Sequence, residues 1–246
     1  MTFAGATTTY DAKTVAYREL IQADRHVACL WVRDAEPEAR RRRIVPDACV
    51  DVVWTGARLV VAGPATGPVL ADVPAGQPAF GVRFRIGAAG AALGLPASEL
   101  LDRTVPLADV WGAAAAHVEE AALAGGVRAL AAAILARVED EPDIAVRAAA
   151  AGVRVGLGER QLRRRFADAV GYGPKTLDRV LRFQRFLALA RTGAPLAQLA
   201  FEAGYADQAH LTRECTRLSG LPPAALLASG AGPAGERPAA PARLAA

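Results

Sequence analysis

Two similar stretches with a central glycine constrain the fold of this chain more than any other feature. In the first, Gly156 follows a helical stretch for which Asp143 is the predicted cap. Gly152 lies four residues before Gly156, and Leu162 lies six residues after it. A helix-turn-helix needs a small residue where its helices touch, a glycine at the turn, and an apolar residue from the second helix. We therefore expect Gly152 to permit close packing and Gly156 to adopt a positive φ.

The second stretch, LAQLAFEAGYADQAHLTRECTRL, follows the same pattern. Gly204 occupies the turn, Ala200 lies four residues before it, and Leu211 lies seven after it. Pro195 suits the first turn of the leading helix, and Asp207 suits the N-cap of the following helix. Between the two stretches, Pro174 opens and Gly193 closes a helix of about 18 residues, or about 27 Å. The spacing predicts two recognition helices about one DNA turn apart, roughly 34 Å.

The second helix of the first stretch is strongly basic. Arg160, Arg163 and Arg164 lie at i, i+3 and i+4 and therefore share one helix face, while Leu162 and Phe166 share another. Residues 158–191 hold nine Lys and Arg against three Asp and Glu, although the whole chain carries only +4. A basic segment on a nearly neutral chain is typical of nucleic-acid contact. The alternative for these arginines is an ordinary solvated face.

The second helix of the second stretch begins with side chains suited to reading bases. Its N-terminal end, the end that enters a major groove, presents Gln208, Ala209, His210 and Arg213. Glutamine and arginine make bidentate contacts to adenine and guanine. For His210, the alternative is a surface histidine without a partner in DNA.

The remaining sequence predicts an α+β protein. Residues 1–112 read as a β-rich domain, because β-branched and aromatic runs occupy residues 26–32, 48–54 and 58–62. Short helices follow in residues 97–112, where Ser98 or Asp109 would cap them. We expect a helical connector at 113–139 divided by Gly125 and Gly126, an all-α DNA-binding domain at 140–228, and a disordered tail at 229–246.

Two stretches of the N-terminal part make specific predictions. AFGVRFRI at residues 79–86 alternates, which predicts a half-buried strand with Phe80, Val82, Phe84 and Ile86 on one face and Gly81, Arg83 and Arg85 on the other. The RRRR run at residues 40–43 is interpreted as a solvated loop or sheet edge rather than a second phosphate site.

Other function classes find little support. The chain has three cysteines, an odd number at wide spacing, which favours a reducing cytoplasm over a disulfide framework. His26, Cys29 and Cys49 do not supply the four ligands of a structural zinc site, and the turn GPATGP lacks the ending of a phosphate loop. The N-terminus has no apolar signal core and no stretch is long enough to span a membrane. We expect no catalytic residues, no metal and no cofactor.

Four ordered motifs together resemble the DNA-binding region of the AraC/XylS family of bacterial transcription regulators. They are LGERQLRRRF (157–166), GYGPKTL (171–177), AGYADQAHLTREC (203–215) and GLPP (220–223). The resemblance covers about a third of the chain. It departs from the family at Cys215, where an aromatic residue is common and where we expect a small core residue. It also departs at Ala151 and Gly152, where larger or helix-favouring residues are common.

The resemblance implies the residues that contact DNA. The implied base contacts are Arg160, Arg163 and Arg164 in the first unit and Gln208, Ala209, His210 and Arg213 in the second. Lys175 and Arg182 are implied as phosphate contacts. Arg165 is expected to point off the groove, either as an ordinary surface arginine or as a phosphate contact. The expected partner is double-stranded DNA, in the cytoplasm and associated with the nucleoid.

The N-terminal part resembles a domain that accompanies this DNA-binding region in many bacterial regulators. The similar motifs are VPDACVDVVW, VVAGPATGP, GVRFRIGAA and LGLPASELLDRTVPLADVWG. The resemblance implies a sensing or dimerising domain, loosely similar to cupin-type sensors, that responds to a small-molecule effector or forms a homodimer. Two alternatives stay open. The domain could be an enzymatic or metal-dependent cupin-like domain fused to a DNA-binding domain, or it could dock another protein.

Overall fold

The computed structural model describes residues 17–229, which form two compact units. The sheet unit comprises the described residues up to 40, together with 49–64 and 73–172. The helical unit comprises residues 41–48, 65–72 and those from 173 onward. The fold is α+β, with a β-rich N-terminal region and a helical C-terminal part, as predicted.

The sheet unit is built on six antiparallel strands in the order β1-β2-β7-β4-β5-β8. Their bounds are Tyr17–Ile21 (β1), Val27–Arg33 (β2), Asp51–Trp54 (β4), Leu59–Ala62 (β5), Ala79–Phe84 (β7) and Thr104–Pro106 (β8). The predicted runs at 26–32, 48–54, 58–62 and 79–86 all contain strands, because β-branched and aromatic side chains pack well on a pleated surface.

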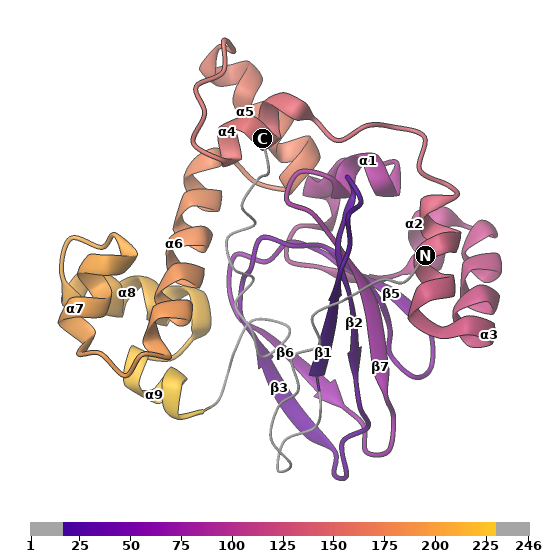
Figure 1. Ribbon diagram of the computed structural model, residues 1–246, viewed down its shortest axis with the longest axis horizontal. Coiled ribbons are helices and arrows are strands. Elements are labelled where there is room, and N and C mark those ends of the chain that lie inside the picture. The colour runs from indigo at the N-terminus through magenta and orange to yellow at the C-terminus, as the bar shows by residue number, and fades with distance from the viewer. Residues whose placement is uncertain (1–16, 230–246) are drawn as a thin grey trace. The chain divides into compact units, whose positions relative to one another are not determined.

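Helices complete the sheet unit, and α3 (Ala114–Leu135) covers part of the sheet (Figure 1). Leu130 and Ile134 of α3 are fully buried with Val82 and Phe84 of β7. Gly126 has non-helical backbone angles, φ 64° and ψ −152°, so the predicted division at the glycine pair is confirmed. The shorter helices are α1 (Ala89–Leu93), the 3-10 helix η1 (Ala97–Leu100), α2 (Leu107–Trp111), α4 (Ile144–Ala150) and α5 (Glu159–Val170).

Strand β7 is buried on both faces, so its prediction as a half-buried strand was wrong. Arg83 is only 2% exposed because Asp51, its register partner on β4, neutralises it. Arg83 Nε donates to Asp51 Oδ1 and Nη2 to Oδ2, both at 3.0 Å. Trp31 lies over Gly81, where a Cβ would come within 2.7 Å of its ring. A buried charge is tolerated when it is paired in this way.

The predicted caps of the short helices were also wrong. η1 begins after Pro96 and α2 begins after Pro106, and neither has a side-chain cap. Neither Ser98 nor Asp109 occupies a cap position, because each lies inside its helix. Proline fixes φ near the value that a helix start requires, which explains why each of these two helices begins directly after a proline.

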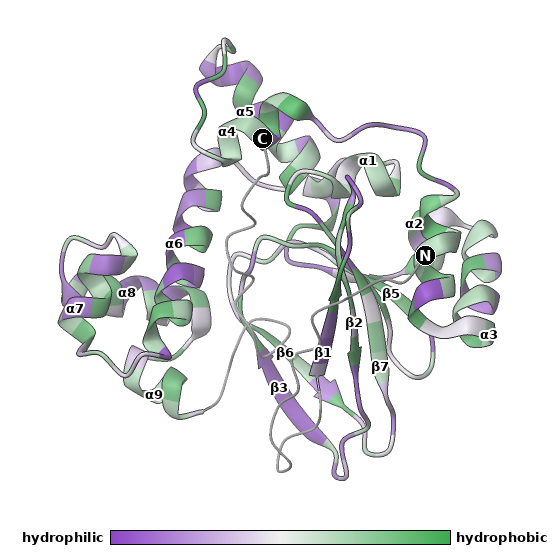
Figure 2. Ribbon diagram, viewed as in Figure 1, coloured by the Kyte–Doolittle hydropathy of each residue, from purple (hydrophilic) through white to green (hydrophobic). Residues whose placement is uncertain are grey.

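The helical unit contains the linker helix α6 (Pro174–Ala190), then α7 (Leu196–Ala203), α8 (Gln208–Ser219) and α9 (Pro223–Ala228). It also contains a two-stranded sheet of β3 (Arg40–Ile44) and β6 (Val69–Val73). β3 holds the RRRR run, which makes most of the strand hydrophilic (Figure 2). The predicted sheet edge is therefore confirmed, but most of this strand packs with the C-terminal helices rather than with the six-stranded sheet.

Candidate nucleic-acid interface

Helix α5 presents the predicted basic face. Arg160, Arg163 and Arg164 are all exposed, and Phe166 and Ala169 on the opposite face are buried. Arg163 donates to Glu159 at 2.5 Å, one turn earlier. This contact is an exposed i,i+4 pair, which is worth only about 0.3–0.5 kcal/mol, so Arg163 remains available to a stronger anion.

The turn before α5 differs from its prediction. Gly152, not Gly156, adopts the left-handed conformation, with φ 81°. A Cβ on Gly152 would meet no atom within 4 Å, so this glycine ends α4 and does not pack against a second helix. The prediction failed because α4 already ends at Ala150, which leaves residues 151–158 as a long connection.

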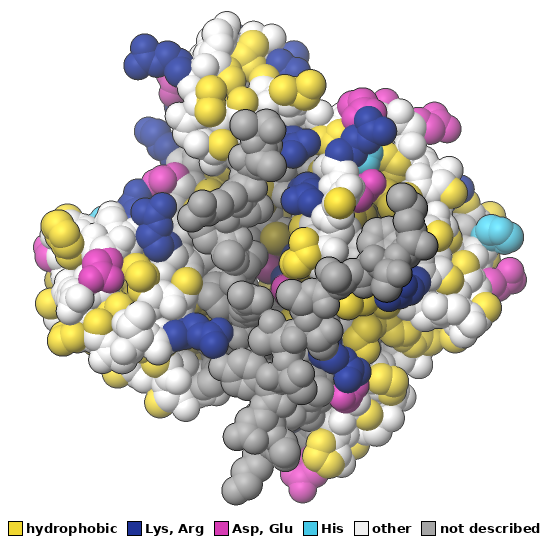
Figure 3. All heavy atoms as spheres, in the orientation of Figure 1, with side chains coloured by type: hydrophobic (Ala, Val, Ile, Leu, Met, Phe, Trp, Pro, Cys, Tyr) yellow, Lys and Arg dark blue, Asp and Glu magenta, His cyan; other side chains and the backbone are white. Residues whose placement is uncertain are grey.

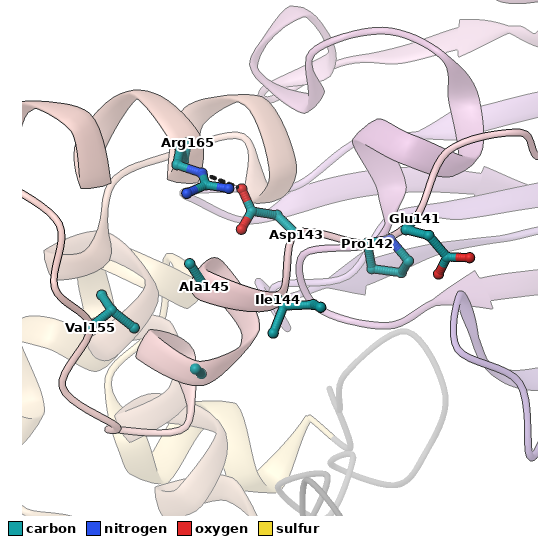
Figure 4. A pocket seen from close by; sticks show the side chains of 8 residues that line it. Glu141, Pro142, Asp143, Ile144, Ala145, Val155 and Arg165 are labelled. Atoms are coloured by element: carbon teal, nitrogen blue, oxygen red, sulfur yellow. Dashed lines mark hydrogen bonds and ion pairs between the residues drawn. The ribbon is translucent and has the colours of Figure 1, made fainter.

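Asp143 organises the start of the first helix pair, as the sequence predicted. Its Oδ1 accepts from the Val146 amide at 3.0 Å and caps α4. Its Oδ2 accepts from Arg165 Nε at 2.6 Å, which ties α5 to α4 beside a shallow hollow that Ile144 also lines (Figure 4). Arg165 therefore differs from its three arginine neighbours, because an acidic partner from α4 holds it.

Two glycines allow α5 to pack closely inside the sheet unit. A Cβ at Gly90 in α1 would lie 2.4 Å from the Asp168 carbonyl oxygen. Gly171, which ends α5 at φ 95°, would place a Cβ 2.4 Å from Pro64 Cγ. The apolar side of α5 is thereby fixed against α1 and η1, while its arginine face stays exposed.

The second helix pair has the short turn that the sequence predicted. Residues 204–207 connect α7 to α8, and Gly204 adopts φ 90°. Ala200 and Leu211 are both fully buried where the two helices meet. Asp207 caps α8, because its Oδ1 accepts from the His210 amide at 2.6 Å. These are the dimensions of a helix-turn-helix.

Helix α8 exposes most of its predicted base-reading residues. Gln208, Ala209 and Arg213 are exposed. His210 is partly buried, because its ring packs edge-on against Tyr205 at 5.2 Å and its Nδ1 accepts from the Ala206 amide at 3.4 Å. His210 thus has a structural role in the turn, and its base contact stays a prediction.

Helix α6 carries the ion pair that fixes α8. Arg179 donates through Nε and Nη2 to the two carboxylate oxygens of Glu214, at 2.7 and 3.0 Å. The Arg179 hydrogen bonds hold the pKa of Glu214 below its ordinary value. Bidentate pairs of this kind fix geometry as well as adding energy. The position of α8 relative to α6 is therefore set by a specific contact.

The two predicted phosphate contacts have different surroundings. Lys175 is exposed in the first turn of α6. Arg182 is half-buried, because it pairs with Asp178 and its guanidinium lies 5.7 Å from the centre of the Tyr205 ring. Basic side chains on the face drawn in Figure 3 lie singly or in small groups, several beside acidic ones. The geometry thus favours Lys175 over Arg182 as a freely available cation.

Comparisons with known protein families match two regions of the chain. Residues 152–229 match a family described as a helix-turn-helix domain. The chain carries an AraC-type helix-turn-helix domain. Residues 22–106 match a domain of unknown function, DUF6597. The expected resemblance to the DNA-binding region of AraC-type regulators is thereby confirmed for residues 152–229.

Two further comparisons add no argument. No curated protein matches the chain. A crystal structure of an apo ToxT variant from Vibrio cholerae is similar at a TM-score of 0.39 and 11% identity, covering 84% of this chain and 98% of that chain. At this TM-score the similarity supports no inference about the AraC-type domain described above.

The structure adds candidate residues that the motifs missed. Thr216 and Arg217 are exposed on α8, and Arg217 lies one turn beyond Arg213. The i,i+4 spacing of the two arginines is visible in the sequence, but the predicted base contacts lie in the N-terminal half of α8 and do not include Arg217. Arg154, exposed in the long turn of the first helix pair, is a second addition.

The described residues include a buried cysteine but no cluster of metal ligands. Cys215 is fully buried in the AraC-type domain, as predicted for a small core residue, and burial raises the pKa of its thiol to about 11. Within residues 17–229, no group of three or more histidine, cysteine and acidic side chains could hold a metal ion. None of the helices in that range has the length and apolarity needed to cross a bilayer.

Proposed function

We propose that the chain is a sequence-specific regulator that places α5 and α8 in successive major grooves of one DNA duplex. The observation that carries the proposal is the exposed polar face of α8 on a short, capped helix-turn-helix. Gln208 and Arg213 lie on this face, and Arg179 fixes the helix through Glu214. A recognition helix held rigidly by its scaffold is what base discrimination requires.

The first recognition helix is proposed to act in the same way. Arg160 and Arg164 are exposed, whereas Arg165 is held by Asp143. The arginine guanidinium can donate two hydrogen bonds either to a guanine edge or to a phosphate. Helix α5 would therefore contribute both to the affinity for DNA and to its sequence specificity. The 17 residues of α6 span about 26 Å, a length suited to a spacing of one DNA turn between the two helices.

The predicted domains and their roles are part of the proposal. Residues 1–112 would form the regulatory domain, 113–139 the connector, 140–228 the DNA-binding domain and 229–246 a tail, of which residues 230–246 lie outside the described residues. The regulatory domain would bind a small-molecule effector or form a homodimer, in a cytoplasmic protein. The alternative of an enzymatic or metal-dependent N-terminal domain is tested by metal analysis of the purified protein.

The experiment compares DNA motifs selected by three variants at one stated salt concentration. Arg160→Ala with Arg164→Ala should relax one block of the motif, and Gln208→Ala with Arg213→Ala should relax the other. Arg128→Ala, an exposed arginine of α3, is the control and should leave both blocks unchanged. If both recognition-helix variants relaxed the same block, or neither block, the tandem arrangement would be wrong.

A further inference from the structure

Two segments of the N-terminal sequence belong to the same unit as the second recognition helix. Residues 41–48 and 65–72 come from the region that matches DUF6597, yet they belong to the helical unit. They contact α6 and the end of α8, although the chain enters and leaves them from the six-stranded sheet. The contacts they make within the helical unit are specific ones.

Arg43 of β3 contacts the C-terminal end of α8. Its Nη1 donates to the Ser219 carbonyl oxygen at 2.8 Å, and Ser219 is the last residue of α8 and fully buried. The last carbonyls of a helix lack intrahelical donors and carry the negative end of the helix dipole, so a guanidinium is well placed there.

Gly220 shows how closely this contact is fitted. It ends α8 at φ 73°, and a Cβ on it would lie 3.0 Å from Arg43 Nη1 and 3.4 Å from Pro68 Cγ. Both excursions of the N-terminal sequence, residues 41–48 and 65–72, therefore reach the same helix end. A larger residue at 220 would have to displace them.

The loop after β3 makes a second contact, this time with α6. Gln184 is buried, and its Nε2 donates to the Pro46 carbonyl oxygen at 2.5 Å. Gln184 lies on the same helix as Arg179, which holds α8 through Glu214. Residues 43–46 thus contact both the recognition helix and the helix that positions it.

The same segment leads directly into the core of the sheet unit. Ala48 is buried with φ 65°, a conformation that L-residues other than glycine rarely adopt. Three residues further on, Asp51 forms the buried ion pair with Arg83. Strained backbone of this kind persists where the surrounding structure determines it, and switch segments are among those places.

We propose that residues 43–48 are a regulatory contact through which the N-terminal domain controls the second recognition helix. A change in the sheet unit near Asp51 would be passed along the chain through Ala48 to the loop at Pro46 and to Arg43, and would alter the position of α8. The proposal rests on the proposed function, because its effect is a change in how strongly α8 binds its block of the DNA motif.

The test measures two affinities for each variant, one for the full selected site and one for a site whose α8 block is scrambled. Arg43→Ala should weaken binding to the full site about five- to tenfold, the lower range of ordinary allosteric couplings, and should leave the scrambled site unchanged. Arg43→Lys should restore most of the loss, because lysine can still donate to the Ser219 carbonyl. Arg41→Ala is the matched control, since Arg41 lies on the same strand and pairs with exposed Asp72 instead.

Gln184→Met provides a second variant that removes the other contact while filling a similar volume. It should lower affinity for the full site alone, as Arg43→Ala does. Equal affinities to wild type in both variants, or equal losses on both sites, would overturn the proposal, because the two contacts would then not act through the α8 block. If the wild-type chain selected no motif at all, the proposed function would fail instead.

Discussion

The buried ion pair between Asp51 and Arg83 gives the sharpest prediction about stability. We expect Asp51→Ala to destabilise the sheet unit strongly, because Arg83 is 2% exposed and would keep its charge without its bidentate partner. The Asp51 carboxylate also accepts from Trp31 Nε1 at 3.1 Å, so the indole loses its acceptor as well.

The size of the effect follows from these contacts. Removing one partner of a buried ion pair costs about 3–5 kcal/mol. Glu19 Oε1 lies 3.5 Å from Arg83 Nη1 and remains as a weaker partner, which places the expected loss at the lower end, about 3 kcal/mol. This is a large share of the roughly 5–15 kcal/mol by which a folded domain is stable.

Urea unfolding followed by tryptophan fluorescence measures this loss. All three tryptophans, Trp31, Trp54 and Trp111, belong to the sheet unit, so the signal reports on it. Asp34→Ala is the matched control, since it breaks an ion pair with Arg18 in which both side chains are 48% exposed, and it should cost less than about 1 kcal/mol. A loss for Asp51→Ala no greater than that of the control would refute the reasoning.

The remaining predictions concern the AraC-type domain. Arg213→Ala should cost about 1–3 kcal/mol at one base position and relax specificity there, as measured by competition among single-base variants of the site. Lys175→Ala should weaken binding about equally on all sequences and reduce the slope of log affinity against log salt by about one unit, which salt titration checks. Asp207→Ala removes the cap of α8 and should cost about 1 kcal/mol in thermal or urea unfolding. Because Arg179 lowers the pKa of Glu214, their contact stabilises the helical unit at neutral pH. This contribution is lost as the pH falls below 4.5, the ordinary pKa of a glutamate. The free energy of unfolding, measured between pH 3 and 7, checks the loss.

Local chemistry explains which parts of the fold were predictable. Asp143 and Asp207 were recognisable as caps, because a cap depends only on a short polar side chain and the few residues that follow it. Gly204 was recognisable as a turn glycine for the same reason. The arginine face of α5 followed from helical spacing alone.

Contacts between distant residues explain what could not be predicted. Arg83 was placed on a solvent-facing side because its partner Asp51 lies 32 positions away in the sequence. The residues of β3 were recognised as a sheet edge, but their packing with α8 depends on Ser219, 176 positions from Arg43. The first turn was misjudged because Gly152 ends α4 in the left-handed conformation and does not pack against a second helix, so Gly156 lies in a long connection.

Selection of genomic DNA fragments by the purified wild-type chain, at one stated salt concentration, tests the central claim most directly. The account predicts an enriched motif with two blocks about ten base pairs apart, one for α5 and one for α8. Uniform, salt-sensitive binding without an enriched motif would contradict it, because the arginines of α5 and the polar face of α8 would then hold phosphates without reading bases.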